Sequence, residues 1–416
     1  MMTVALLWSF GLLEQASQEL SSFVVKTDPS YSWKRKTVLG QGALELVSQT
    51  WQGAPWKHDV LIVNPSGPKL KGSAIIEVTG WEPNQRDISY AQTLADSSGL
   101  SVALLFHVPN QPLFGMEEDD LIAHTFEKFF ETGDPTWPLL FPMVKSVKAA
   151  MDALGEAEGV EKFVVTGGSK RGWTAWLVGA LRDPRVVGIA PVVFDNLGFV
   201  AQLQQQKAYW DGYSPMIADY TERGLQDLLE SERGKELVRL MDPLQYASSI
   251  TVPTLVLTGT NDPYWTIDST QLYWSKLAMP KWSLAVPNAG HTMGDKGWWA
   301  PSLGKFARTY ADGARLPSVS SRMTVEVGTW KLGIDTSPGP TSYTVWSTTS
   351  PDMHFDKAVW KEVETKELAT TEGNRGIWVT GERAKTYNTA VLVELKFSTS
   401  NGEVRLTTPV YLARKR

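Results

Sequence analysis

Short apolar segments alternate with helix-length segments over the first three quarters of this chain, and this alternation restricts its fold more than any other feature. In a predicted helix over Leu139–Leu154, the apolar side chains lie on one face, and Lys145 and Lys148 lie on the opposite face. Several of the predicted strands are apolar on both faces, as buried parallel strands are. These predicted strands are Val60–Val63, Ala74–Val78, Val102–Phe106, Phe163–Val165, Val186–Val193, Thr254–Leu257 and Trp282–Val286. The pattern predicts a mostly parallel α/β sheet covered by helices, with ligands beyond the carboxyl ends of its strands.

The pattern changes after about Ser318. Apolar and polar residues then alternate with a period of two, as over 323–327 and 391–397, and Gly, Pro, Ser and Thr turns separate these segments. Such a pattern predicts an all-β sandwich over 318–416. We place the domain boundary near Pro317, so that the α/β domain covers 21–317.

One long segment, about 197–250, interrupts the α/β alternation with glutamines, aromatic residues and helical charge patterning. A long insertion between two core strands is typically a functional cap. The alternative is an elaboration of the fold without a functional role.

The N-terminus contains an apolar run, Thr3–Leu13, followed by the small residues Ala16 and Ser17. Its length fits a signal peptide over 1–20, which predicts a secreted or periplasmic protein, although no Lys or Arg precedes the run. The alternative is an apolar first helix in a cytoplasmic protein. The run is too short to span a membrane, and no other segment has 18 uninterrupted apolar residues, so we expect no integral membrane segment.

Composition narrows the possible chemistry. The chain has no cysteine, which excludes a thiol nucleophile and cysteine-ligated metals, and its five histidines lack the spacing of a zinc site. A net charge of −5, from 40 basic and 45 acidic residues, does not suggest nucleic-acid binding. We therefore expect no metal, no cofactor and no nucleic acid, and a small-molecule or peptide substrate. No pattern in the chain specifies an oligomeric state.

The strongest chemical signal is a strand, a serine-containing turn and a helix in direct succession. Phe163–Thr166 leads into Gly-Gly-Ser-Lys-Arg-Gly at 167–172, and an apolar helix follows over 173–181. A nucleophile elbow needs this order, because glycines permit the sharp turn and the helix N-terminus supplies N–H groups for an oxyanion. The usual spacing is Gly-x-Ser-x-Gly, whereas here the second glycine falls one residue later, at Gly172. The alternative is an ordinary glycine-rich turn.

An acid and a histidine follow the serine in the order that α/β-hydrolases require. The strand 254–257 leads into Thr258–Pro263, which contains Asp262, and the strand 282–286 leads into Pro287–His291. Asp195, which follows an earlier strand, is the alternative acid, and we favour Asp262. Asp268 and Asp295 fit helix caps or surface positions better.

The other histidines are weaker candidates for the base than His291. They are found before the sheet core, after a strand, in a charged helical segment and in the C-terminal domain: His58, His107, His124 and His354.

These assignments define a mechanism. His291 would take the proton of Ser169, and Asp262 would hold the imidazole. The Lys170 N–H would be one oxyanion donor, and the loop at Gly80 and Trp81 would supply a second.

The side chains of Lys170 and Arg171 would either bind an anionic substrate or oxyanion, or be solvated or paired with local carboxylates. Trp173 would border the same site.

The chain resembles the PhoPQ-activated pathogenicity-related proteins, a family that also includes secreted amoebal proliferation repressors. The shared stretches span most of 28–300, and they are Ser48-Gln49-Thr50-Trp51, Trp56-Lys57-His58, Val108-Pro109-Asn110-Gln111-Pro112, Thr132-Gly133-Asp134-Pro135-Thr136-Trp137-Pro138, Thr166-Gly167-Gly168-Ser169-Lys170-Arg171-Gly172-Trp173, Gly259-Thr260-Asn261-Asp262-Pro263 and Asn288-Ala289-Gly290-His291. The resemblance implies an α/β-hydrolase fold, frequent export, and Ser169, Asp262 and His291 as site residues. It also implies that the shifted glycine is a family trait. A local similarity to glucuronoyl esterases places Lys170 where their basic residue follows the serine.

Three functions are consistent with these features. The first is a serine hydrolase that cleaves an ester or amide through an acyl-enzyme. The second is a secreted signalling or binding protein on a hydrolase fold with little activity. The third, a special case of the first, is a carbohydrate esterase in which tryptophans stack on sugars. The chain has 18 tryptophans, and those expected around the site are Trp81, Trp173, Trp210, Trp265, Trp298 and Trp299.

Overall fold

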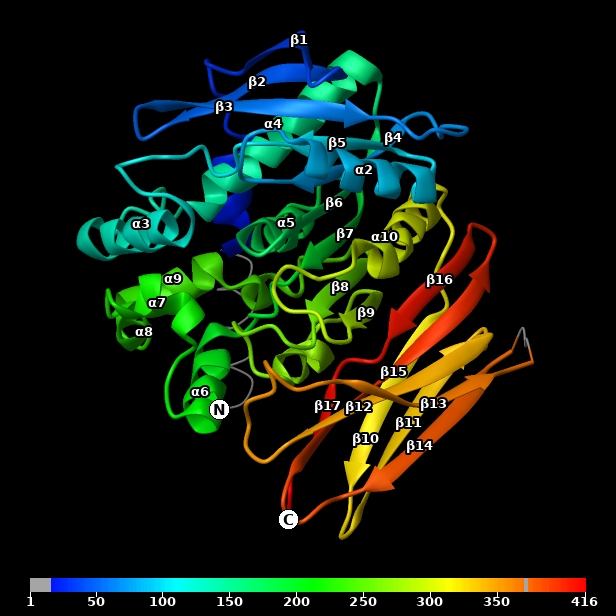
Figure 1. Cartoon of the computed structure of the whole chain (residues 1–416). Helices are drawn as coiled ribbons and strands as arrows, with labels where there is room; N and C mark the ends of the chain where they lie inside the picture. The colour runs from blue at the N-terminus through cyan, green and yellow to red at the C-terminus, as the bar shows by residue number, and fades with distance from the viewer. Residues whose placement is uncertain (1–15, 370–372) are drawn as a thin grey trace, which may run out of the picture.

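A computed structural model describes residues 16–369 and 373–416. In this part of the chain, a 14-stranded sheet runs through the molecule in the order β1-β2-β3-β5-β4-β6-β7-β8-β9-β16-β15-β12-β13, with β17 beside β15. The strands from β5 to β9 are parallel, and the strands outside them pair antiparallel. The predicted mostly parallel sheet is therefore confirmed (Figure 1).

Strands β3 to β9 of the α/β part agree with the seven apolar segments predicted from the sequence, whereas the sequence analysis did not predict β1 and β2. Their bounds are β1 Ser32–Val38, β2 Gln41–Trp51, β3 Ala54–Val63, β4 Ser73–Val78, β5 Ser101–Leu105, β6 Lys162–Gly168, β7 Val186–Val192, β8 Thr254–Gly259 and β9 Lys281–Val286.

Helices cover both faces of the parallel strands, because successive strand residues point to opposite faces. On β4, Ile75 packs with α2 and α10, whereas Ile76 packs with α4 and α5. The bounds of these helices are α2 Gln85–Ser98, α4 Leu140–Glu158, α5 Lys170–Ala180 and α10 Lys296–Ala311.

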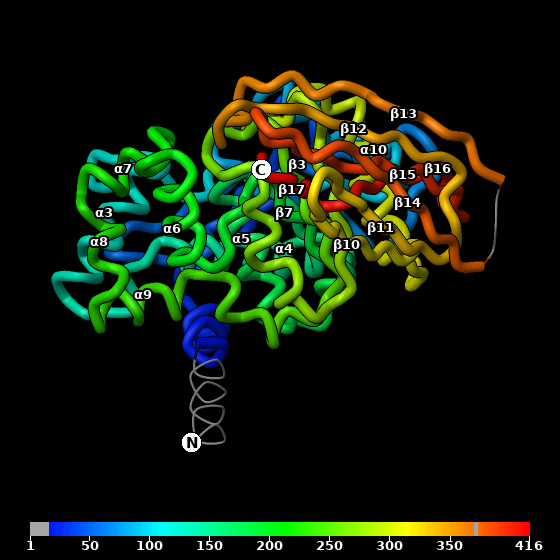
Figure 2. Tube along the Cα trace, turned by 90° about the horizontal axis from the view of Figure 1, so that it is seen from below, coloured from blue at the N-terminus to red at the C-terminus, as the bar shows by residue number. Residues whose placement is uncertain are grey.

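The segment between β7 and β8 is the helical cap. It packs beside α3, and the cap helices and α3 lie together at one side of the molecule in both views (Figures 1 and 2). The elements are α3 Glu118–Thr132, α6 Phe199–Trp210, η1 Pro215–Ile217, α7 Ala218–Thr221, α8 Leu225–Leu228, α9 Glu232–Met241 and η2 Pro243–Tyr246. The loop after β8 adds η3 Ser269–Leu272 and η4 Trp274–Lys276.

The C-terminal strands form a second, antiparallel β region. One layer is the three-stranded sheet β10-β11-β14, and the other is formed by β12, β13, β15, β16 and β17. Leu332 of the first layer and Leu395 of the second belong to one buried cluster, as in a sandwich. The bounds are β10 Ser318–Val325, β11 Thr329–Ser337, β12 Ser342–Ser350, β13 Lys361–Glu367, β14 Arg375–Glu382, β15 Asn388–Thr399, β16 Gly402–Thr407 and β17 Tyr411–Ala413.

The sequence does not indicate that the second layer continues the central sheet. β16 pairs antiparallel with β9 at Thr407 and Ser283, so the two parts of the molecule share a hydrogen-bonded edge. A strand edge covered in this way is not open to other chains.

The N-terminal apolar run Thr3–Leu13 lies outside the described residues. Residues 16–25 are helical, and Ala16, Leu20 and Val24 are buried in the main core. Among the described residues, no helix combines the length and the apolar character that a membrane crossing needs.

Candidate active site

Ser169 lies at a sharp turn between β6 and α5. Its backbone is in a conformation with φ 58° and ψ −125°, and its N–H donates to the carbonyl oxygen of Val192 at 2.8 Å. Non-glycine residues rarely adopt positive φ, and strain of this kind is typical of functional sites. The displaced glycine has a steric explanation, because a Cβ at Gly172 would lie 2.7 Å from the Val192 oxygen.

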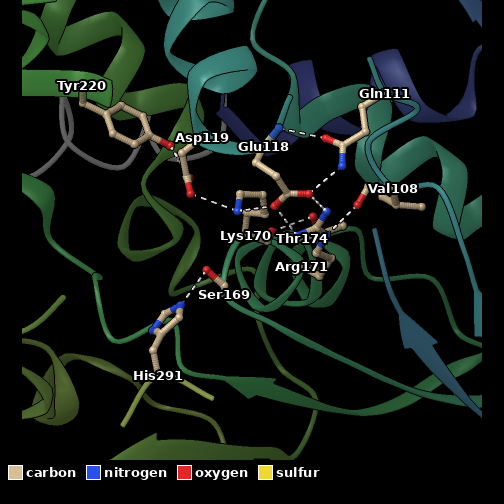
Figure 3. Close-up of polar contacts among 10 residues, drawn as sticks. All are labelled: Val108, Gln111, Glu118, Asp119, Ser169, Lys170, Arg171, Thr174, Tyr220 and His291. Carbon is tan, nitrogen blue, oxygen red and sulfur yellow. Dashed lines mark hydrogen bonds and ion pairs between the residues drawn. The ribbon is translucent and has the colours of Figure 1, made fainter. Parts of the chain in front are cut away.

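The structure brings Ser169, His291 and Asp262 together from three separate loops. His291 Nε2 lies 2.9 Å from Ser169 Oγ, and His291 Nδ1 lies 2.8 Å from Asp262 Oδ2. The loops follow β6, β8 and β9, whose carboxyl ends share one edge of the sheet. Figure 3 shows the Ser169 hydroxyl directed at the imidazole. The Asp262 side chain is buried, whereas the His291 side chain is 20% exposed, so the imidazole is open to a substrate.

Asp195, the alternative acid, lies in a different network. Its carboxylate accepts hydrogen bonds from Ser269 at 2.5 Å, from Thr270 at 2.7 Å and from Tyr273. Burial raises the pKa of Asp195 despite these hydrogen bonds. The hydrogen-bonding partner of His291 is thus Asp262, as the sequence order favours.

Tyr264 is a site residue that sequence reasoning missed. Its ring stacks on His291 with centroids 4.0 Å apart and planes at 26°, and its backbone N–H donates to Asp262 Oδ1 at 3.0 Å. Tyr264 therefore constrains both the imidazole and the carboxylate. Its position two residues after Asp262 was the only available signal.

Lys170 and Arg171 are paired with carboxylates at the start of α3 (Figure 3). Glu118 accepts from Lys170 Nζ at 2.6 Å and from both Arg171 Nη atoms at 2.5 and 2.7 Å. Asp119 forms a second ion pair with Lys170 at 2.9 Å, and Arg171 Nε donates to the Val108 carbonyl at 2.6 Å. Of the two interpretations of these cations, the structure shows the pairing with local carboxylates.

The loop after β4 lies against this ion-pair cluster. A Cβ at Gly80 would lie 1.7 Å from Arg171 Nη2, so any larger residue here would collide with the guanidinium in its present position. Trp81 is 53% exposed and does not contact the cavity described below. Trp173 does line that cavity, and its indole N–H donates to the Met241 carbonyl at 2.6 Å.

Of the other four tryptophans expected at the site, one lines the cavity and three lie elsewhere. Trp265 lines the cavity, whereas Trp210 stacks on His354, and Trp298 lies beneath Arg405. Trp299 packs in the core against Tyr90.

A cavity of about 100 Å³ opens beside Ser169 beneath the cap. Its lining comes from α3, the start of α5, the loops after β7 and β8, and cap helices α6 to α9. The insertion thus forms most of one wall of the candidate site. Within the described residues, no group of three or more His, Asp or Glu side chains could hold a metal ion.

Two asparagines attach the acid and base loops to the C-terminal β region. The Asn261 Nδ2 lies within hydrogen-bonding distance of three backbone carbonyls at 355–358, including Ala358 at 2.6 Å. The Asn288 amide pairs with both the N–H and the carbonyl of Trp360, at 2.8 and 3.0 Å. Asn261 precedes Asp262 and Asn288 lies three residues before His291, so the β region supports both loops. The sequence motifs contained these asparagines without indicating their partners.

The sheet, the elbow and the cap together define an α/β-hydrolase fold. An acetyl xylan esterase from Paenibacillus sp. R4 has a similar structure, with a TM-score of 0.52, 15% sequence identity, and coverage of 71% of this chain and 93% of that one. This likeness concerns the fold.

The chain belongs to the PhoPQ-activated pathogenicity-related protein family, whose model matches residues 20–356. It is also 33% identical over 306 residues to autocrine proliferation repressor protein A of Dictyostelium discoideum. That match covers 67% of this chain and 62% of the relative, so the chain spans less than two thirds of the relative's length.

Proposed function

We propose that this protein is a serine hydrolase that cleaves an ester or amide bond through an acyl-enzyme. The observation that carries the proposal is the hydrogen-bonded chain from Ser169 through His291 to Asp262, with the serine on a strained turn at a helix N-terminus. Serine hydroxyls become nucleophiles when an oriented base takes their proton.

The proposed reaction has two halves. Ser169 Oγ attacks the substrate carbonyl, and its proton passes to His291 Nε2, while Asp262 stabilises the imidazolium that forms. The Lys170 N–H and the loop at Gly80 and Trp81 would stabilise the oxyanion. The imidazolium then protonates the leaving group, and a water activated by His291 releases the acyl group and frees the serine.

Active-site labelling tests this proposal. We expect a fluorophosphonate to modify the wild-type protein on the peptide that contains Ser169, as detected by mass spectrometry. Ser169→Ala and His291→Ala should abolish labelling, and Asp262→Asn should slow it by at least about a hundredfold.

The matched control is the other buried aspartate. Asp195→Asn changes a carboxylate that does not contact His291, and it should leave most of the labelling intact. An adduct that survives Ser169→Ala would refute the assignment, and a loss caused by Asp195→Asn would move the acid to the earlier loop.

A second candidate function is that of an exported signalling or binding protein. The similarity to autocrine proliferation repressor protein A favours it. The same serine variant separates the two functions. If the protein acts by binding, the wild type and Ser169→Ala should repress proliferation equally well. If it acts as a hydrolase, Ser169→Ala should no longer repress proliferation.

A further inference from the structure

We propose that the cavity beside Ser169 binds an apolar, ring-sized group of the substrate. This inference rests on the proposed hydrolase function and names the substrate class for that site. It concerns the group on one side of the scissile bond, and the experiment below distinguishes the acyl side from the leaving-group side.

The cavity wall is mainly aromatic and aliphatic. Phe126, Phe194, Phe199 and Leu225 are all buried around it, and they come from α3, the loop after β7 and the cap. Burying the apolar surface of a ligand against such a wall is favourable. A polar or charged group would lose its hydration here without recovering an equivalent set of partners.

The volume of the cavity limits the group to about one ring. About 100 Å³ is several times the roughly 10–15 Å³ that one water needs, and it approaches the roughly 150 Å³ cavity known to bind benzene. A long acyl chain would therefore not fit within this volume.

Most polar side chains of the lining already have partners. Asp119 accepts from Tyr220 at 3.0 Å and pairs with Lys170, and Gln206 bonds to the backbone of Ser214 and Tyr264. Asn196 also lines the cavity, but its Oδ1 is inaccessible to solvent and has no hydrogen-bond partner in the described part of the chain. The polar side chains of the lining therefore offer a ligand few accessible hydrogen-bonding groups.

The packing of Trp173 disfavours a sugar stacked on its indole. Stacking on a sugar requires a free indole face, but Phe194 stacks on Trp173 with centroids 5.0 Å apart and planes at 16°. Phe199 meets the same indole at 88°. The Trp173 indole is thus used in packing and is not free to stack on a sugar.

A panel of matched esters tests the size and polarity of the group. On the acyl side we would compare p-nitrophenyl acetate, 3-phenylpropionate and laurate, and on the leaving-group side ethyl and benzyl acetate. We expect kcat/KM to be at least tenfold higher for the ring-bearing ester on one side, and the laurate to be poorer than the 3-phenylpropionate.

Two adjacent leucines provide a matched pair of variants. Leu229 lines the cavity, whereas Leu228 is exposed. Leu229→Trp should reduce the ratio of kcat/KM for ring-bearing to small esters by about tenfold, and Leu228→Trp should leave the ratio at its wild-type value. Equal ratios in both variants would overturn the location of the group.

The labelling experiment keeps failure of this inference separate from failure of the hydrolase proposal. Ser169 could be labelled while kcat/KM is the same for all esters of the panel, or while acetylated sugars are preferred. In either case the substrate class is wrong and the hydrolase proposal stands. If Ser169 is not labelled, both are overturned.

Discussion

Glu118 is the residue on which the charges beside the nucleophile depend. It adopts φ 53°, and its backbone N–H and its carboxylate both bond to the Gln111 side chain, at 2.8 and 2.6 Å. Burial alone would raise the pKa of Glu118, but the hydrogen bonds and charges of Arg171 and Lys170 lower it to about 2. The Glu118 carboxylate therefore holds the two cations that follow Ser169 directly, Lys170 and Arg171.

This depressed pKa predicts a pH-dependent contribution to stability. A carboxyl whose pKa falls from 4.5 to about 2 on folding stabilises the fold by about 3 kcal/mol above pH 5. The contribution declines as the pH falls from about 5 toward 2. Glu118→Gln should thus lower the free energy of unfolding by about 3 kcal/mol at pH 7 and by less than half of that at pH 3.

Urea denaturation between pH 7 and pH 3 measures this difference. Glu117→Gln is the matched control, because its exposed side chain precedes Glu118 directly, and it should follow the wild-type profile. If wild type and Glu118→Gln differ by the same amount at every pH, the ion-pair explanation fails.

At the scale of elements, α3 connects the nucleophile turn to the cap. Its first turn contacts Lys170 through Glu118 and Asp119, and Asp119 also bonds to Tyr220 of α7. Arg223 attaches the following cap segment to α3, at 2.5 Å from Asp120 and in contact with Glu127. Charged contacts to α3 thus help to hold the cap that walls the candidate cavity, besides its apolar packing.

We expect Arg223→Gln to loosen the cap without unfolding the sheet. Losing a partly buried ion pair of about 1 kcal/mol would raise the population of locally open cap about fivefold. Limited proteolysis should show a corresponding acceleration of cleavage within 197–250. Lys235→Gln breaks only an exposed pair within α9 and should not change the cleavage rate, and equal rates in both variants would contradict the role of Arg223.

At the scale of the whole molecule, the C-terminal β region completes the site without reaching the cavity. Its 355–360 segment bonds to Asn261 and Asn288, beside the acid and the base. It also extends the central sheet through β16, so that the two parts of the molecule share one sheet. The region therefore positions the acid and base loops.

Asn288→Gly tests this support, because Asn288 has φ 59° and glycine removes the side chain without backbone strain. We expect kcat for ester hydrolysis to fall about tenfold with little change in KM, because His291 is less well oriented. Asn401→Ala removes a contact between the β region and α10 away from the site, and it should leave kcat unchanged. If kcat is unchanged in Asn288→Gly, the β region does not position His291 through Asn288 and contributes only to stability.

The sequence by itself determined the elements and the loops that contain the site. Strand and helix periodicity and turn chemistry are local, so the alternation of segments predicted the parallel sheet, and the glycines predicted the turn at Ser169. The chain order of serine, acid and histidine followed from the same sheet, because loops after parallel strands meet at one edge. His291 and Asp262 could accordingly be named before their distance was known.

Only the tertiary structure decided which partners these residues have. Glu118 reaches Arg171 across 53 positions and Asn261 reaches Phe355 across 94, and no periodicity encodes contacts at such separations. The pairing of Lys170, the exposure of Trp81 and the separate network of Asp195 depend in the same way on the packing of distant elements. The sequence therefore determined which residues occupy the loops at the sheet edge, and the packing of α3, the cap and the β region around those loops decided the shape and charge of the candidate site.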